Sequence, residues 1–170
     1  MDMGTLRAAT GGIGMIIRDL APGDRDDVRE ALVDCAAFSA AEVRMALDMV
    51  ESGLNGDYVL PAVEMDGRVR AYACLGKAIL TASSWYLYWI CVHPAYQGRG
   101  IGRRLQDHVE EIVRQAGGDR VVVETSGRAD YQRTRSFYRR AGFSVSGRIR
   151  DFYKTGDDCV IYTKVLGRVA

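Results

Sequence analysis

The chain contains few of the residues from which metal centres and disulfide frameworks are built. Its 170 residues include four cysteines and two histidines. No two cysteines form a C-x-x-C pair, and three of the four lie in apolar surroundings, where cysteine acts as a small core side chain. A zinc site needs several closely spaced cysteines or histidines, so the sequence predicts no metal site.

Long hydrophobic runs and an excess of one charge are missing as well. No apolar run approaches the roughly 20 residues that cross a bilayer as a helix, and the N-terminus has no signal-peptide pattern. The 23 basic and 22 acidic residues are interleaved and leave a net charge of +1. A nucleic-acid partner usually requires a basic face. These absences predict a cytoplasmic protein with neither a membrane nor a nucleic-acid partner.

A chain of this length can bury a sizeable core within one domain. We expect that domain to span residues 15–166. The first 14 residues are rich in glycine, alanine and threonine. They are expected to form a loose N-terminal extension.

The most informative stretch begins at residue 85. Aromatic and branched residues over 85–92 suit a strand, which Pro94 ends because it has no N–H for a ladder. A glycine-rich turn follows. Apolar residues then recur at steps of three and four, as on one face of a helix. These residues are Ile101, Leu105, Val109, Ile112 and Ala116.

This strand, glycine turn and helix together suit a bound anion. The first amides of a helix have no partner inside it, and the helix dipole places partial positive charge there. Glycines at 98, 100 and 102 allow close approach to the backbone, and Arg99, Arg103 and Arg104 add full charge. The pattern predicts a phosphate site, most simply for a pyrophosphate. A glycine-rich surface turn with solvated arginines is the alternative.

Neither common nucleotide-binding glycine pattern fits this turn. In G-x-G-x-x-G the third glycine would fall on Arg103, and Asp119 precedes the next apolar run instead of ending it. The pattern G-x-x-x-x-G-K-[ST] is absent. A nucleotide-binding protein of Rossmann type stays open as a weaker alternative.

The pattern that fits is Gln97-Gly98-x-Gly100-x-Gly102 after a strand ending in Val92-x-Pro94. It resembles the acyl-CoA pyrophosphate loop of the GNAT superfamily of N-acetyltransferases. The stretch 135–143 also resembles the family's helix end, with Tyr138 at the position of the family tyrosine. The resemblance extends over residues 15–166.

The resemblance implies a mixed α/β (α+β) fold. We expect a mostly antiparallel central sheet of six to seven strands, flanked by about four helices. A splayed parallel pair, formed by 85–92 and 120–125, should lie at its centre. A final hairpin over 143–165 could offer an edge strand for a homodimer.

The resemblance further implies that acetyl-CoA is the co-substrate and that no metal takes part. The strand would contact the pantetheine arm and the loop would contact the pyrophosphate, which gives Ile90, Cys91, Val92, Gln97, Gly98, Arg99, Gly100, Ile101, Gly102 and Arg103 as cofactor-binding residues. Tyr131 occupies a position where the family often has a cofactor-contacting asparagine.

The implied reaction moves an acetyl group to a primary amine. No cysteine has a partner that suggests an acyl-enzyme, so direct attack in a ternary complex is expected. Tyr138 matches the family residue that serves the leaving thiolate, and Glu124 is the best remaining carboxylate for a general base. A packed core tyrosine and a salt-bridged or capping glutamate are the alternatives.

The acceptor side is less defined. Six aromatic residues are expected to line it, although many aromatics at such spacing are core residues: Phe38, Tyr86, Tyr88, Trp89, Phe152 and Tyr153. The acceptor could be a small-molecule amine, an amino-acid-like amine or a protein. A catalytically silent acyl-CoA-binding sensor or partner subunit is the alternative function.

Overall fold

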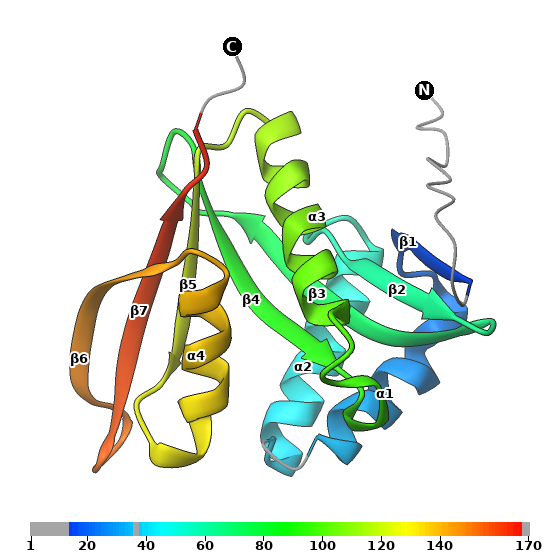
Figure 1. The fold of residues 1–170 in the computed structure, drawn as a ribbon, viewed down its shortest axis with the longest axis horizontal. Helices are drawn as coiled ribbons and strands as arrows, with labels where there is room; N and C mark the ends of the chain where they lie inside the picture. The colour runs from blue at the N-terminus through cyan, green and yellow to red at the C-terminus, as the bar shows by residue number, and fades with distance from the viewer. Residues whose placement is uncertain (1–13, 36–37, 168–170) are drawn as a thin grey trace. The chain divides into compact units, whose positions relative to one another are not determined.

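The computed structural model describes residues 14–35 and 38–167 (Figure 1). Within them lie seven strands and four helices, in the order β1 (Met15–Asp19), α1 (Arg25–Asp34), α2 (Ala40–Leu54), β2 (Pro61–Met65), β3 (Arg68–Lys77), β4 (Ser84–Val92), α3 (Ile101–Gln115), β5 (Arg120–Ser126), α4 (Gln132–Arg140), β6 (Ser144–Lys154) and β7 (Asp157–Val165). The predicted N-terminal extension falls on residues outside the described ranges, apart from Gly14.

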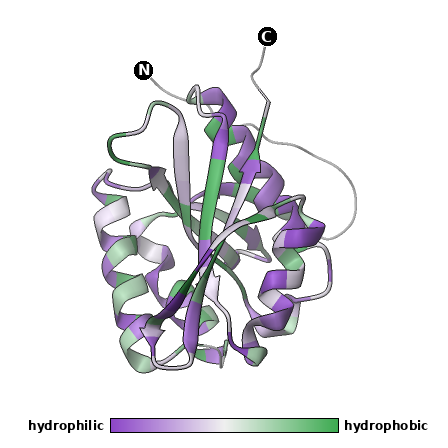
Figure 2. Ribbon diagram, turned by 90° about the vertical axis from the view of Figure 1, so that its left-hand side faces the viewer, coloured by the Kyte–Doolittle hydropathy of each residue, from purple (hydrophilic) through white to green (hydrophobic). Residues whose placement is uncertain are grey.

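The strands form one sheet in the order β1-β2-β3-β4-β5-β7-β6. Strand β4 runs parallel to β5, and each of the other pairings given by residue register is antiparallel. The predicted fold class is therefore confirmed. The four helices carry hydrophobic and hydrophilic residues around the same turns, as helices that bury one side do (Figure 2).

The described chain forms two compact units, and the first contains residues up to 74 together with 89–105. Its core joins α1 and α2 to β2 and β3 through buried side chains that include Val28, Leu32, Val50 and Tyr72. Helix α2 begins in a capping box. The amide of Glu42 donates to the Ser39 hydroxyl, and the amide of Ser39 donates to the Glu42 carboxylate. These two bonds satisfy donors that a helix start leaves open.

The second unit contains residues 75–88 and 106 onwards. Strand β5 pairs with β7 along its whole length, and with β4 over Ser84–Tyr86. Helix α3 is tied to β7 by a buried ion pair. The Lys164 ammonium donates to both Glu110 carboxylate oxygens at 2.7 and 2.8 Å, and to the Ala141 carbonyl at 2.7 Å. The single domain expected over residues 15–166 stays a prediction.

None of the helices in the described ranges combines the length and the hydropathy that a membrane-crossing helix needs.

Replacing Lys164 with methionine should destabilise the protein. Glu110 is 3% exposed, so its carboxylate would lose its closest cation without gaining water. We expect the free energy of unfolding to fall by about 3 kcal/mol, measured by urea denaturation. The exposed Lys154→Met is the matched control. An equal change in both variants would show that the buried pair adds nothing.

Candidate functional site

The predicted phosphate loop follows the end of β4 in the first unit. A short 3₁₀ turn, Pro94–Tyr96, comes first. It is closed by the Tyr96 amide, which donates to the His93 carbonyl at 2.8 Å, and by the Gln97 amide, which donates to the Pro94 carbonyl at 3.2 Å. The Gln97 carboxamide also donates to the Val92 carbonyl at 3.0 Å. The chain is therefore fixed immediately before the glycines begin.

The amides of residues 98–102 donate to no backbone carbonyl in the part of the chain that the structure describes. The first bond of α3 runs from the Arg104 amide to the Gly100 carbonyl at 3.1 Å. Residues 97–100 are exposed, so the amides of Gly98, Arg99 and Gly100 lie where a ligand could reach them. The predicted site residue Ile101 is buried, and Gly102 is half-buried. This is the arrangement expected of an anion site at a helix N-terminus.

Two glycines of the loop adopt a left-handed backbone. Gly98 has φ +76° and Gly100 has φ +79°, a region that costs other residues free energy. A Cβ at either position would meet no protein atom within 4 Å. The protein's own packing therefore does not exclude a side chain there. The left-handed backbone is therefore the reason for glycine at these positions. The open space above them is available to a ligand.

One basic residue of the loop, Arg99, and one of β3, Arg70, contact the same aromatic ring. The Arg99 guanidinium lies 5.2 Å from the centre of the Tyr96 ring, and the Arg70 guanidinium lies 4.9 Å from it. Cation–π contacts of this kind restrict a long side chain at little cost. Arg99 therefore has a preferred position beside the exposed amides.

The predicted cofactor-binding residues of β4 differ in burial. The Cys91 side chain is 3% exposed, and its thiol donates to the Ala31 carbonyl at 3.7 Å. A hydrogen bond with the Cys35 thiol, followed by burial, raises the pKa of Cys91 well above its usual range. Cys91 therefore stays a neutral thiol and is a poor nucleophile. Ile90 and Val92, on either side of it, are half-buried.

Each aromatic residue expected on the acceptor side contacts the ring of another one. In the first unit, the Phe38 and Trp89 rings meet edge-on at 5.2 Å, and the Trp89 indole donates to the Met49 sulfur at 3.2 Å. In the second unit, Tyr86 stacks on Tyr88 at 5.7 Å.

The remaining pair lies in β6, also in the second unit. The Phe152 and Tyr153 rings lie 5.0 Å apart, and both side chains are about half exposed. The Tyr153 hydroxyl donates to the Cys159 sulfur at 3.8 Å.

Tyr138 is buried in the second unit, with 4% of its surface exposed. Its ring contacts Phe137, Phe143 and Tyr162 at centroid distances of 5.4 to 6.0 Å. Burial raises the pKa of Tyr138 above its ordinary value, because the phenolate would lose its hydration. The hydroxyl therefore keeps its proton at neutral pH and can act as a donor.

Glu124 lies on β5 in register with Ile161, and its side chain is exposed. Its charge helps to raise the pKa values of Tyr153 and Cys159, although burial is the larger cause for both. The charge of the predicted base thus acts on one predicted acceptor residue, Tyr153. Tyr131 is the half-buried residue that precedes α4, and its side chain does not cap that helix.

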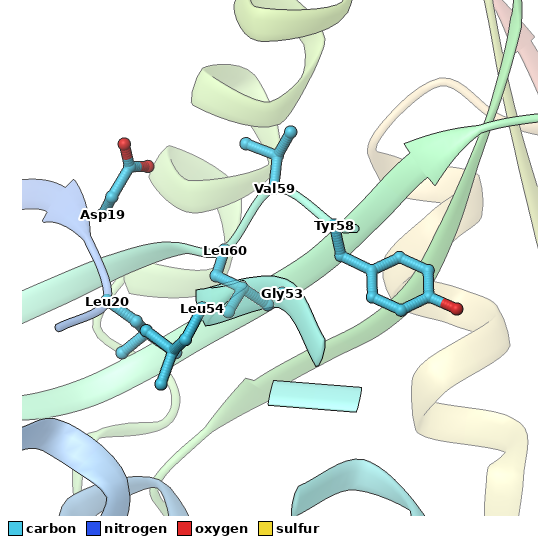
Figure 3. Close-up of a pocket in the computed structure, with 7 residues that line it drawn as sticks. All are labelled: Asp19, Leu20, Gly53, Leu54, Tyr58, Val59 and Leu60. Carbon is cyan, nitrogen blue, oxygen red and sulfur yellow. The ribbon is translucent and has the colours of Figure 1, made fainter. Parts of the chain in front are cut away.

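A cavity of about 280 Å³ opens elsewhere in the first unit, between the end of β1, the end of α2 and the start of β2 (Figure 3). Its seven lining residues include none of the predicted site residues; they are Asp19, Leu20, Gly53, Leu54, Tyr58, Val59 and Leu60. The loop is therefore the candidate site, and this cavity shares none of its residues.

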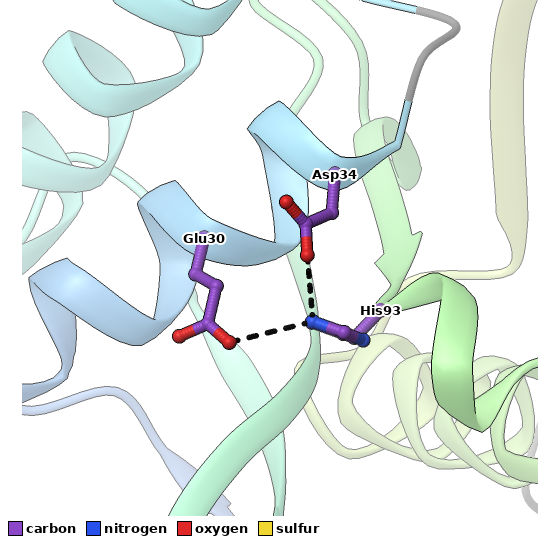
Figure 4. A group of neighbouring side chains, drawn as sticks. All are labelled: Glu30, Asp34 and His93. Carbon is purple, nitrogen blue, oxygen red and sulfur yellow. Dashed lines mark ion pairs between the residues drawn. The ribbon is translucent and has the colours of Figure 1, made fainter.

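Sequence reasoning did not find the group formed by Glu30, Asp34 and His93 (Figure 4). Their ligand atoms lie within 4.8 Å of one another, close enough for a metal ion. The His93 Nδ1 atom, however, accepts from the Ala95 amide at 3.2 Å. The neutral ring must then carry its proton on Nε2, the atom nearest the carboxylates. The sequence does place Glu30 and Asp34 four residues apart, on one face of a helix. That spacing does not indicate that His93 lies against them.

A family model described as the acetyltransferase (GNAT) family matches residues 25–143. A crystal structure of a GNAT-family protein from Desulfovibrio desulfuricans is 34% identical, with a TM-score of 0.87, and the match covers 91% of this chain and 100% of that one. The structure of yncA from Salmonella typhimurium with its cofactor acetyl-CoA has the same fold, at 20% identity and a TM-score of 0.70, over 92% of this chain and 96% of that one.

The N-alpha-acetyltransferase RimI of Mycobacterium tuberculosis is 37% identical over 89 residues, which make up 52% of this chain and 53% of the relative. The chain spans 27% to 64% of the length of the curated relatives it matches. The family model nevertheless covers more than half of the chain, and the fold agrees with it. This chain therefore belongs to the acetyltransferase (GNAT) family.

Proposed function

We propose that the protein is an acetyl-CoA-dependent N-acetyltransferase whose loop 97–103 holds the pyrophosphate of coenzyme A. The observation that carries the proposal is the run of amides 98–102 at the start of α3, which have no carbonyl partner within the described ranges. Arg99 and Arg103 add positive charge to the same loop, and α3 contributes its dipole. A diphosphate carries the charge and the acceptor oxygens that these groups fit.

The backbone of β4 is the proposed partner of the pantetheine arm, a chain of amides that needs donors and acceptors. The ladder to β5 covers only Ser84–Tyr86, which agrees with a role for the later residues in ligand binding. The Val92 carbonyl already accepts from Gln97. We therefore expect Ile90 and Cys91 to provide most of the strand's contacts, and Tyr131 to take the place of the family asparagine.

Bound acetyl-CoA would supply an acetyl group on a thioester. The chain's residues must then remove a proton from the acceptor amine and provide a proton or a hydrogen bond to the leaving thiolate. An alkyl ammonium has a pKa of about 10 and must lose its proton before the amine can attack, so we assign Glu124, through a water chain, as the base. Tyr138 donates a hydrogen bond to the developing thiolate. Since burial raises its pKa, hydrogen bonding is favoured over complete proton transfer.

The acceptor is proposed to be a primary amine beside a partly apolar group. Phe38 and Trp89 supply an aromatic edge, and Tyr153 lies within reach of the Glu124 charge. Because RimI of M. tuberculosis is named as an N-alpha-acetyltransferase, peptide α-amines are the first class to test. We further propose a cytoplasmic location and a homodimer formed through β6, the last strand of the sheet.

A thiol-release assay with acetyl-CoA tests the proposal. Peptide N-termini, polyamines, lysine derivatives and small amines form the panel. Turnover with at least one amine is expected. Tight coenzyme A binding without turnover on any amine would instead favour a silent acyl-CoA sensor. No detectable coenzyme A binding would overturn both functions.

Replacing Gly100 with alanine should weaken coenzyme A binding. The substitution forces a left-handed backbone on alanine and places a methyl group in the open space of the loop. We expect an affinity loss of about tenfold by calorimetry, in line with a strain of 1–2 kcal/mol. Gly156→Ala is the matched control, because Gly156 has φ +81° and the same open surroundings at a hairpin tip. It should lose similar stability and no coenzyme affinity.

Tyr138→Phe should lower kcat by about 100-fold while coenzyme A affinity stays within about twofold. Phenylalanine keeps the ring contacts with Phe143 and Tyr162 and removes only the proposed donor. Steady-state kinetics and calorimetry separate the two effects. Tyr162→Phe, which removes a hydroxyl from the neighbouring buried ring, should leave kcat unchanged. Equal kcat in Tyr138→Phe and the parent would reject the role.

Glu124→Gln should lower kcat by about 100-fold at saturating acetyl-CoA, because the amide cannot accept the amine proton. The side chain is exposed, so the thermal midpoint should not change. Glu111→Gln, another exposed carboxylate in the same unit, serves as the control. Similar kcat values in the two variants would show that another group acts as the base.

A further inference from the structure

His93 makes several contacts at the start of the phosphate loop, through its backbone and through its ring. Its amide donates to the Arg70 carbonyl of β3 at 2.8 Å, and its carbonyl accepts from the Tyr96 amide at 2.8 Å. Its Nδ1 atom accepts from the Ala95 amide at 3.2 Å. The imidazole ring also meets the Tyr96 ring edge-on at 5.7 Å. One residue therefore shapes the turn that leads to Arg99 and the exposed amides.

The opposite side of the ring faces α1. Nε2 lies 3.2 Å from the Asp34 carboxylate and 3.5 Å from the Glu30 carboxylate (Figure 4). The side chain is buried, and Nε2 has no aligned hydrogen-bond acceptor in the described part of the chain. The contact is electrostatic, between the Nε2 proton and two carboxylates. Glu30 also pairs with Arg68 and, at 3.9 Å, with Arg70, whereas Asp34 faces the ring.

The group formed by Glu30, Asp34 and His93 suits a proton on the His93 Nε2 atom better than a metal ion. Coordination through Nε2 needs a lone pair there, which moves the ring proton to Nδ1. The Nδ1 proton and the Ala95 amide proton would then face each other. The hydrogen bond from the Ala95 amide to Nδ1, which holds the turn, would be lost. The loop and a metal would thus compete for the same imidazole.

We propose that His93 is a positioning residue for the phosphate loop, holding the turn through Nδ1 and tying it to α1 through Nε2. The inference rests on the proposed function, because it concerns the affinity of the loop for coenzyme A. It adds α1 to the elements that set this affinity, although α1 contributes no residue to the loop. Asp34 lies at the last turn of α1 and is the closer of the two carboxylates, so a change in that helix would reach the loop mainly through its contact with Nε2.

Two substitutions at His93 separate its two contacts. In His93→Asn, the shorter side chain can still accept from the amide two residues on, but it no longer reaches Asp34. In His93→Ala both contacts are lost. We expect coenzyme A affinity, measured by calorimetry, to fall about threefold for asparagine and about tenfold for alanine. With kcat at saturating acetyl-CoA within about twofold, the effect would appear in KM, as positioning requires.

A double-mutant cycle tests the link to α1. Asp34→Asn should weaken coenzyme A binding by about threefold in the parent and cause no further loss in His93→Asn, because the contact is already absent there. Asp26→Asn makes the same charge change on the exposed surface of α1 and should have no effect. Thermal melting shows that each variant is folded.

Several results would overturn the inference. They are an unchanged coenzyme affinity in His93→Ala, an Asp34→Asn effect that is equally large in both backgrounds, or a loss of binding on chelation that Zn²⁺ restores. If the parent itself did not bind coenzyme A, the proposed function would fail together with this inference. Binding by the parent with no response in the variants would remove the inference alone.

Discussion

The proposed site depends on a short run of backbone amides that have no carbonyl partner among residues 14–35 and 38–167. On one side, Gln97 closes the preceding turn through its amide and returns its carboxamide to β4. On the other side, the helical pattern begins at Arg104. Between them the left-handed glycines direct the chain so that donors stay exposed, where water can satisfy them until a ligand does. The proposed affinity for an anion would thus come from the backbone.

The charged and aromatic side chains around this loop divide into two groups. In the first group, the Tyr96 ring lies against the Arg99 and Arg70 guanidinium groups. In the second, the imidazole of His93 faces the carboxylates of α1. Arg70 joins the two groups, because it also lies 3.9 Å from the Glu30 carboxylate. The acidic side chains of α1 are thus paired close to the proposed phosphate loop.

The two proposed catalytic groups have opposite environments. Tyr138 is enclosed by aromatic rings, which disfavour the phenolate and preserve a neutral donor. Glu124 is exposed on its strand, where water stabilises the carboxylate. A reaction that must remove one proton and stabilise a thiolate needs this pair of properties. The burial of Tyr138 and the exposure of Glu124 create this difference.

By itself, the sequence determined the element order and the location of the glycine loop, because helix periodicity, strand composition and turn residues are local signals. The fold class followed from the family resemblance that the glycine loop and the stretch 135–143 carry. The contacts of His93 with Glu30 and Asp34, and of Cys91 with Cys35, were decided by tertiary structure alone. These groups meet only when strand β4 ends beside α1, and no periodicity in a single chain records which distant residue will lie across from another.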